Sequence, residues 1–118
     1  MYKFEGLQVW QEGIKLATIC YGIANTLPDY ERSGLSDQLR RAVSSILFNI
    51  AEGSGAENDK EFLRFLHISR KSLYETISIL KFIEHIYKRV ELKSVFQNCD
   101  TVGKLLNVLI RKLNNDKI

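Results

Sequence analysis

A single proline, Pro28, interrupts this chain of 118 residues, and only seven glycines accompany it. Proline and glycine are the residues that most often end helices, so their scarcity leaves room for long, uninterrupted helices. Hydrophobic residues make up 45% of the sequence and charged residues 26%, which is ordinary for a globular domain. We therefore predict an all-α fold in one domain that spans residues 1–118.

Apolar residues recur at helical spacing in four segments of the chain. The predicted helices cover approximately residues 7–27, 36–52, 59–87 and 91–114. Short connections between long helices predict an antiparallel up-and-down four-helix bundle. We expect residues 115–118 to fray, as chain ends often do.

Several residues predict where these helices begin and end. Pro28 ends the first helix because its ring clashes with the preceding turn, and Ser36 is predicted to cap the second. Gly53 and Gly55 are predicted to end the second helix. Asn58, with Glu61 three residues later, has the spacing of a capping box before the third. Small side chains on the core face of that helix, at Ser69, Ser72 and Thr76, predict the close approach of a neighbour.

The first predicted helix has a wider apolar arc than packing on one neighbour requires. One stripe consists of Val9, Leu16, Cys20, Ile23 and Leu27, and a second beside it consists of Leu7, Trp10, Ile14 and Tyr21. Together they cover about half of the cylinder. The helix is therefore either central in the bundle or shared with another subunit.

The second predicted helix carries Phe48 on the side opposite its core stripe, in register with Arg41, Ser45 and Glu52. Such an aromatic is either a singly exposed residue or part of a subunit contact, and interfaces are enriched in aromatic residues and arginine. We predict an oligomer interface formed by Trp10, Tyr21, Arg41, Ser45, Phe48, Asn49 and Glu52. An active site of Arg41, Asn49 and Glu52 is the alternative, but no nucleophile with an adjacent base accompanies them.

The third predicted helix interleaves basic residues with aromatics on its exposed arc. Lysine and arginine neutralise phosphates and aromatics stack on unpaired bases, so this pattern predicts an RNA or single-strand surface. The predicted nucleic-acid-binding residues are Arg64, Arg70, Lys71, Tyr74, Lys81, Lys88 and Arg89. Glu75 and Glu84 interrupt the set, and the net charge is only +3, so a solvated mixed face is the alternative.

No motif in the sequence predicts a reaction. His67 and His85 are separated by five helical turns, about 27 Å, and cannot share a metal ion. Cys20 and Cys99 are isolated on apolar faces, which is more typical of structural thiols than of a redox pair. A phosphate-binding glycine loop, CxxC, HExxH and GxSxG are all missing from the sequence. We expect no catalytic residues, no cofactor and no metal site.

Two further features of the sequence predict where in the cell the protein is located. The N-terminal residues lack the apolar run of a signal peptide, and the chain contains no stretch of about 18 uncharged residues. We expect a cytoplasmic protein without membrane contact.

Four segments of the sequence resemble one bacterial family. They are FEGLQVWQEG (4–13), GLSDQLRRA (34–42), SSILFNIAEGSG (44–55) and EFLRFLHISRKSLYE (61–75). Together they resemble the four-helix-bundle proteins encoded in 23S rRNA intervening sequences. The resemblance implies a homopentameric ring without enzymatic activity. It also implies kinship with accessory proteins of diversity-generating retroelements, which engage a reverse transcriptase and nucleic acid.

The sequence departs from the usual pattern of this family at four positions that bear on function. Members commonly have proline and serine where Leu47 and Phe48 stand, arginine near Ala56, and glycine near Lys71. Leu47 restores an amide donor and predicts a straighter second helix. Ala56 removes one candidate phosphate contact.

Taken together, the residues and the resemblance predict a non-enzymatic ring-forming bundle that presents basic faces to RNA or to a nucleic-acid enzyme. The alternative is a pure protein–protein scaffold that ignores nucleic acid. An enzyme would instead require a pocket with a strongly perturbed titratable group.

Overall fold

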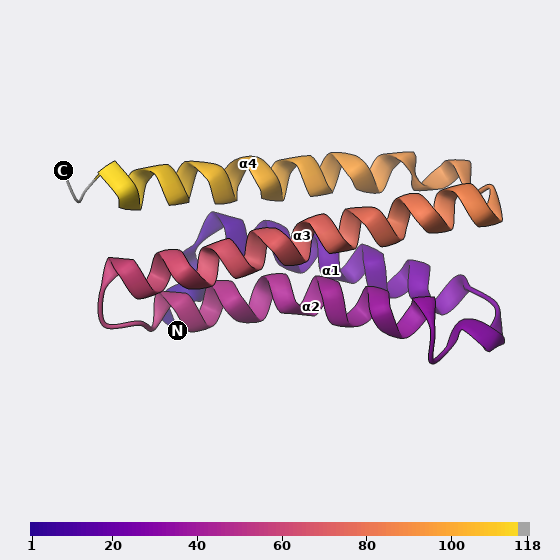
Figure 1. Cartoon of the computed structure of the whole chain (residues 1–118), viewed down its shortest axis with the longest axis horizontal. Coiled ribbons are helices and arrows are strands. Elements are labelled where there is room, and N and C mark those ends of the chain that lie inside the picture. Colours follow the sequence, from indigo (N-terminus) through magenta and orange to yellow (C-terminus); the bar gives the residue numbers. More distant parts are fainter. Residues whose placement is uncertain (116–118) are drawn as a thin grey trace.

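The computed structural model describes residues 1–115 and consists of four long α-helices joined by short connections (Figure 1). The helices are α1 (Gln8–Thr26), α2 (Leu35–Ser54), α3 (Asp59–Tyr87) and α4 (Lys93–Asn115). Short 3-10 helices occupy Lys3–Gly6, Asp29–Glu31 and Val90–Leu92. No strand occurs among these 115 residues, and the predicted all-α bundle is confirmed.

Each helix runs antiparallel to the one before it, along the 48 Å axis of the molecule (Figure 1). α2 packs between α1 and α3, and α4 packs against α1 and α3 on the other side. α2 and α4 therefore lie at opposite corners of the bundle and make no contact with each other in the described range. This arrangement leaves the outer side of α2 uncovered by the rest of the chain.

The core is built from the apolar stripes that the sequence predicted. Leu16, Ile46, Leu80 and Leu106, one from each helix, are completely buried. Leu63 of α3 and Ile110 of α4 are buried as well. Burial of these side chains is the main source of stability, at about 25 cal/mol for each Å² of apolar surface removed from water.

Ser36 does not cap α2, contrary to our prediction. The helix begins at Leu35, one residue earlier, with Gly34 at its N-cap position. Ser36 is buried inside the first turn, and its hydroxyl donates a 2.9 Å hydrogen bond to the carbonyl oxygen of Ala24 near the end of α1. The side chain thus joins two helices instead of ending one, because the tight corner brings the last turn of α1 beside the first turn of α2.

The corner between α2 and α3 differs from its prediction in two details. Gly53 lies within α2, which continues to Ser54 and has Gly55 as its C-cap. Asn58 caps α3 as predicted, since its side chain accepts a 2.9 Å hydrogen bond from the amide of Glu61. The carboxylate of Glu61, however, turns toward Arg64, with 2.9 Å between Oε1 and Nε. The reciprocal half of a capping box is therefore replaced by an ion pair along the helix.

α4 begins at Lys93, two residues later than the sequence predicted, because Val90–Leu92 form a 3-10 turn. Lys88 ends α3 in the left-handed region, at φ 51°. Of the predicted fraying segment 115–118, only Asn115 lies among the described residues, and it is the last residue of α4. None of the helices in residues 1–115 combines the length and the apolarity that a membrane span requires.

Candidate interaction surface

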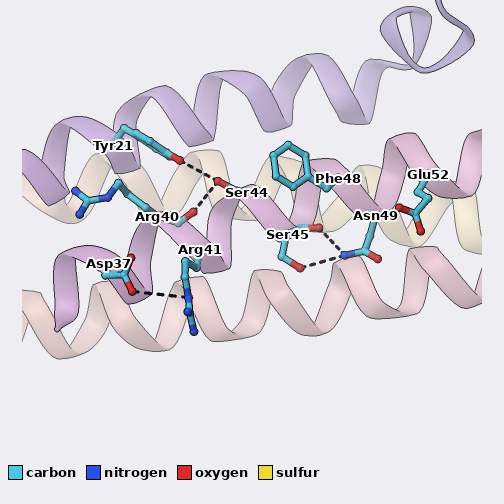
Figure 2. A pocket seen from close by; sticks show the side chains of 9 residues that line it. All are labelled: Tyr21, Asp37, Arg40, Arg41, Ser44, Ser45, Phe48, Asn49 and Glu52. Atoms are coloured by element: carbon cyan, nitrogen blue, oxygen red, sulfur yellow. Dashed lines mark hydrogen bonds and ion pairs between the residues drawn. The ribbon is translucent and has the colours of Figure 1, made fainter. Parts of the chain in front are cut away.

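An open groove of about 500 Å³ runs along the outer side of α2, between α1 and α3 (Figure 2). Nine residues line it: Tyr21, Asp37, Arg40, Arg41, Ser44, Ser45, Phe48, Asn49 and Glu52. Six of the seven residues predicted as an oligomer interface are among them. We call these nine residues the α2 groove.

Phe48 projects from the middle of the α2 groove and exposes 69% of its surface. Ile46 and Ile50 lie two residues before and after Phe48, so they point to the opposite side of the helix, where both are fully buried. The helical period therefore forces the Phe48 ring outward. Tyr21 and Ile14 of α1, exposed by 42% and 40%, extend the apolar surface next to it.

Polar side chains on both flanks of Phe48 are held in place by hydrogen bonds (Figure 2). Toward α1, the hydroxyls of Tyr21 and Ser44 are 3.1 Å apart, and Ser44 donates to the carbonyl oxygen of Arg40 at 2.7 Å. Toward α3, the hydroxyls of Ser45 and Ser72 are 2.8 Å apart. The amide of Asn49 donates to the carbonyl oxygen of Ser45 at 2.8 Å. The walls of the groove are thus preorganised.

Charged side chains lie at the two ends of the α2 groove. Arg41 lies toward the start of α2, where its Nε is 3.8 Å from Oδ2 of Asp37. The two side chains expose 78% and 45% of their surface, and ion pairs of this kind contribute little to stability. Glu52 is exposed one turn beyond Phe48 and forms no ion pair within residues 1–115. One end of the groove therefore carries the pair Arg41 and Asp37, the other end carries Glu52, and the ring of Phe48 lies between them.

Sequence reasoning missed Asp37, Arg40 and Ser44, which also line the α2 groove. Ser44 lies four residues before Phe48, and Asp37 lies eleven residues before it. Both spacings place a side chain on the same side of a helix as Phe48, so the reasoning that selected Arg41 could have found both residues. Trp10 lies outside the groove. It is half-buried and packs against Phe4, with 5.0 Å between ring centres, at the start of the chain.

The predicted nucleic-acid residues do not form one free basic patch. Four of the cations are engaged within the chain: Arg64 with Glu61, Arg70 with Asn107, Lys81 with Glu84 and Arg89 with Glu91. Arg64 and Lys81 also lie over the rings of Phe65 and Phe96, at 4.5 and 4.1 Å from the ring centres. The hydrogen bond to Arg64 lowers the pKa of the Glu61 carboxyl. Lys71 and Lys88 are exposed.

Tyr74 and Arg70 line a second groove, of about 300 Å³, between α3 and α4. Tyr74 exposes 70% of its surface. Arg70 is held at 3.2 Å from both Oδ1 of Asn107 and Nδ1 of His67, and Lys104 and Asp100 of α4 complete the charged lining. We call this the α3/α4 groove. It brings together two of the seven predicted nucleic-acid residues.

The remaining reactive side chains are two histidines on α3 and two buried cysteines; His67 contacts Arg70 of the α3/α4 groove, and Cys99 is among the residues that line it. His67 and His85 are exposed on α3, and residues 1–115 contain no cluster of three or more metal-ligating side chains. Cys20 and Cys99 are buried free thiols. Burial raises the pKa of the Cys20 thiol to about 12 and that of the Cys99 thiol to about 11.

Fold and surface together define a small antiparallel four-helix bundle whose most prominent feature is an aromatic-centred groove on one helix. A family model described as 23S rRNA-intervening sequence protein matches residues 5–108. The chain therefore belongs to the 23S rRNA intervening-sequence protein family, as the sequence motifs predicted.

A solved structure shares the same fold. It is the crystal structure of a protein of unknown function from the S23 ribosomal protein family of Bacteroides thetaiotaomicron VPI-5482. The two chains superpose with a TM-score of 0.79 at 24% sequence identity, over 87% of this chain and 95% of the other. At that identity the likeness establishes the fold alone. Comparison with curated proteins finds no match.

Proposed function

We propose that this protein is a non-enzymatic assembly subunit that acts by self-association through the α2 groove. The observation that carries the proposal is Phe48, which exposes 69% of its surface between preorganised polar walls. Exposing a phenylalanine to water costs about 1.5–3 kcal/mol relative to burying it. A second protein surface on the groove would recover that energy.

The neighbouring side chains support a contact of moderate strength. Tyr21, Phe48 and Arg41 are of the residue types enriched at the centres of protein interfaces, whereas their polar neighbours are of the kind that forms a rim. The apolar surface continues onto Ile14 of α1, so the contact extends over two helices. The family resemblance implies that the assembly is a homopentameric ring.

Phe48→Glu tests the proposal. The charged side chain leaves the core of the bundle untouched but cannot be buried in an interface without a large desolvation cost. We expect the purified variant to show a lower mass than the wild type in light scattering after size exclusion, with an unchanged helical circular dichroism spectrum. Tyr74→Glu, at an equally exposed aromatic on α3, is the matched control and should keep the wild-type mass. A wild-type protein that remains a single subunit at micromolar concentration would refute self-association.

Nucleic-acid binding is a second candidate function, and the α3/α4 groove is the observation that favours it. Tyr74 presents an exposed ring for base stacking beside the oriented guanidinium of Arg70 and the ammonium of Lys104. Ring assembly would repeat this modest surface around the particle. A protein scaffold that engages a partner without nucleic acid is the competing proposal, because four of the six predicted nucleic-acid-binding cations already have acidic or amide partners.

A gel-shift titration with a short single-stranded RNA distinguishes these two candidates. Binding through phosphates should weaken steeply as salt rises, and Tyr74→Ala should weaken it about fivefold to a hundredfold, the value of one stacked base. Ser78→Ala, at an exposed position of α3 outside the α3/α4 groove, is the control and should leave the shift unchanged. An absent or salt-insensitive shift would remove nucleic acid from the proposal and leave the scaffold.

A further inference from the structure

A closed ring of identical copies requires two different patches on each copy, because the two neighbours are contacted through different sides. The α2 groove supplies one of them. A second hollow, of about 290 Å³, lies between the start of α1 and the second half of α4. We call it the α1/α4 groove; its lining is mostly apolar and consists of Leu7, Gln8, Val9, Leu105, Val108, Leu109 and Lys112. Val108 exposes 53% of its surface there.

We propose that the α1/α4 groove of one copy receives the Phe48 ring of the next copy, so that Glu52 meets Lys112 across the contact. The proposal rests on the self-association argued above and names the surface that the α2 groove binds. The heights of the two grooves along the bundle, the directions in which they face and their charges support this pairing.

α2 and α4 run in the same direction and can be aligned through α3, which packs against both (Figure 1). The hydroxyls of Ser45 on α2 and Ser72 on α3 are 2.8 Å apart. A Cβ atom at Gly103 of α4 would lie 3.4 Å from the side chain of Leu73, the next residue of α3. Ser45 and Gly103 are therefore at nearly the same height along the bundle.

Counting from these two positions places the two grooves level with each other. Phe48 lies three residues beyond the first position and Val108 five beyond the second, so their heights differ by about 3 Å. Glu52 and Lys112 differ by the same amount. Rotation about an axis parallel to the helices preserves every height. The Phe48 ring can therefore enter the α1/α4 groove of the next copy without a shift along the bundle.

The two grooves also face directions that allow a ring to close. The helices occupy the corners of the bundle in the order α1, α2, α3, α4, and Ile14 and Tyr21 extend the apolar part of the α2 groove toward α1. In a square bundle this contact faces about 90–135° away from the α1/α4 side. The two contacts of one copy must face about 90° apart in a ring of four, about 108° in a ring of five and about 120° in a ring of six.

The exposed apolar surface of α1 supports contacts on both of its sides. Ile14 and Tyr21 lie next to α2 and expose 40% and 42% of their surface, and Ile19 exposes 37%. Ile19 lines a further hollow between α1 and α4, of about 260 Å³. The wide apolar arc of this helix is thus only partly covered within its own chain. A ring in which each copy has two neighbours would cover it from both sides.

Charge complementarity links the ends of the two grooves. Glu52 is exposed and forms no ion pair within residues 1–115. Lys112 is also exposed and has no ion-pair partner in that range. The second half of α4, residues 103–115, contains Lys104, Arg111 and Lys112 but no acidic residue. The glutamate of a neighbouring copy therefore meets only cations on this part of α4.

Val108→Glu tests the receiving surface. A carboxylate there cannot be buried against Phe48 without a large desolvation cost. Because Val108 is half exposed, we expect an unchanged helical circular dichroism spectrum, together with the mass of a single subunit in light scattering after size exclusion. Asn114→Glu is the control and should keep the wild-type mass, since Asn114 follows Asn107 by seven residues and lies on the side of α4 that faces α3.

A mixture of two single variants tests whether the two grooves meet each other. Phe48→Glu keeps an intact α1/α4 groove and Val108→Glu keeps an intact α2 groove, so the mixture can form one contact and no second. We expect a species of twice the subunit mass from the equimolar mixture and single subunits from either variant alone. The double variant Phe48→Glu/Val108→Glu lacks both patches and should associate with neither single variant.

Charge reversal tests the pairing of Glu52 with Lys112. Glu52→Lys places two lysines opposite each other and Lys112→Glu places two glutamates there, so each should raise the dissociation constant of the contact about tenfold. The double variant Glu52→Lys/Lys112→Glu restores opposite charges at every contact and should return to within about threefold of the wild type. Analytical ultracentrifugation over a concentration series measures these changes.

The outcomes separate this inference from the proposed function. If Val108→Glu assembles as the wild type does, the α1/α4 groove is not the receiving surface. If both single variants are single subunits and their mixture is too, the two grooves do not meet each other. A double charge variant as weak as the single ones would refute the pair of Glu52 with Lys112. In all three cases self-association itself survives, whereas a wild type that stays a single subunit overturns both.

Discussion

The hydroxyl of Ser69 donates a 2.8 Å hydrogen bond to the main-chain carbonyl oxygen of Ile46 and so joins the middle of α3 to the middle of α2. Both residues are fully buried. Ser72 and Thr76 continue the same face of α3 with small side chains, of which Ser72 meets Ser45. The predicted close approach is confirmed: α2 and α3 form the most extensive helix pair of the bundle. This pairing holds α2 in place and leaves Phe48 on the outside.

Ser69→Ala should lower the free energy of unfolding by about 1 kcal/mol, because one buried hydrogen bond is lost and little volume is removed. Ser69→Leu should cost more, about 1–3 kcal/mol, since the added methyl groups force the two helices apart. Urea denaturation followed by circular dichroism, at one fixed protein concentration, measures both. Ser78→Ala, exposed on the same helix, should change stability by less than about 0.5 kcal/mol.

Gly53→Ala should destabilise the bundle although alanine is the better helix former. A Cβ atom at Gly53 would lie 2.8 Å from Cβ of Phe65 and 2.9 Å from Cδ1 of Phe62, so the end of α2 would have to move from α3. Overpacking of this kind costs about 1–3 kcal/mol, against about 1 kcal/mol gained in helix propensity.

Gly22→Ala is the matched control for Gly53→Ala. Gly22 is exposed within α1, and an added Cβ would meet no atom within 4 Å. Only the helix propensity then changes, so we expect an increase in stability of about 0.5–1 kcal/mol. Equal effects of the two substitutions in urea denaturation would show that the α2–α3 corner tolerates a side chain at Gly53.

Cys20 and Cys99 should make the protein less stable as the pH rises above about 9. Burial raises their thiol pKa values from 9.0 to about 12 and about 11, so the folded chain keeps both protons while the unfolded chain releases them. The unfolded state then binds fewer protons, and the free energy of unfolding falls with increasing pH. The loss begins near the unfolded pKa and continues until the folded pKa values are reached.

A double Cys20→Ala/Cys99→Ala variant should show a shallower decline between pH 9 and pH 11 than the wild type, whatever its stability at neutral pH. The same burial predicts that neither thiol reacts with a chromogenic disulfide reagent in the folded state and that both react in urea. Rapid labelling of the native protein would contradict the burial of these side chains.

Tyr87→Phe should loosen the attachment of α3 to the corner between α1 and α2. The Tyr87 hydroxyl donates to Oε2 of Glu31 at 2.5 Å and lies 3.2 Å from the Tyr30 hydroxyl. Oε1 of Glu31 in turn accepts from the amide of Leu35, at the start of α2. We expect a lower midpoint in urea, with a smaller change than for Gly53→Ala, because the cluster is partly solvated.

A spectroscopic titration of the tyrosines tests the same contact. The hydrogen bond to Glu31, followed by that to Tyr30, raises the pKa of Tyr87. One tyrosine should therefore ionise later than the others as the pH rises, and Tyr87→Phe should remove this late step. A variant with an unchanged titration curve would place the late-ionising group elsewhere.

Periodicity in the sequence predicted most of the fold because it is a local property. Leu39, Val43, Ile46 and Ile50 recur every three or four residues, and the helical geometry alone places them on one side of α2 and Phe48 on the other. The same reasoning identified six residues of the α2 groove. It depends only on neighbours along one helix, and each helix here is long enough for the pattern to be unambiguous.

Contacts between helices could not be predicted in this way. Ser36 has the residue type of a cap, yet the tight corner brings the Ala24 carbonyl within its reach and the side chain becomes a link between helices. Gly53 has the residue type of a helix stop, yet Phe62 and Phe65 make it a point of close approach. Both outcomes depend on atoms that lie far along the chain or across a turn, which a local pattern does not contain.

The sequence by itself determined four amphipathic helices, the composition of their core and the outward position of Phe48. The tertiary structure alone decided that α2 lies opposite α4, and that Tyr21 of α1 and Phe48 of α2 line the same groove. It also decided that Arg70 of α3 is held by Asn107 of α4. The physical reason is that helical spacing places a side chain on a face, whereas only packing determines which faces meet.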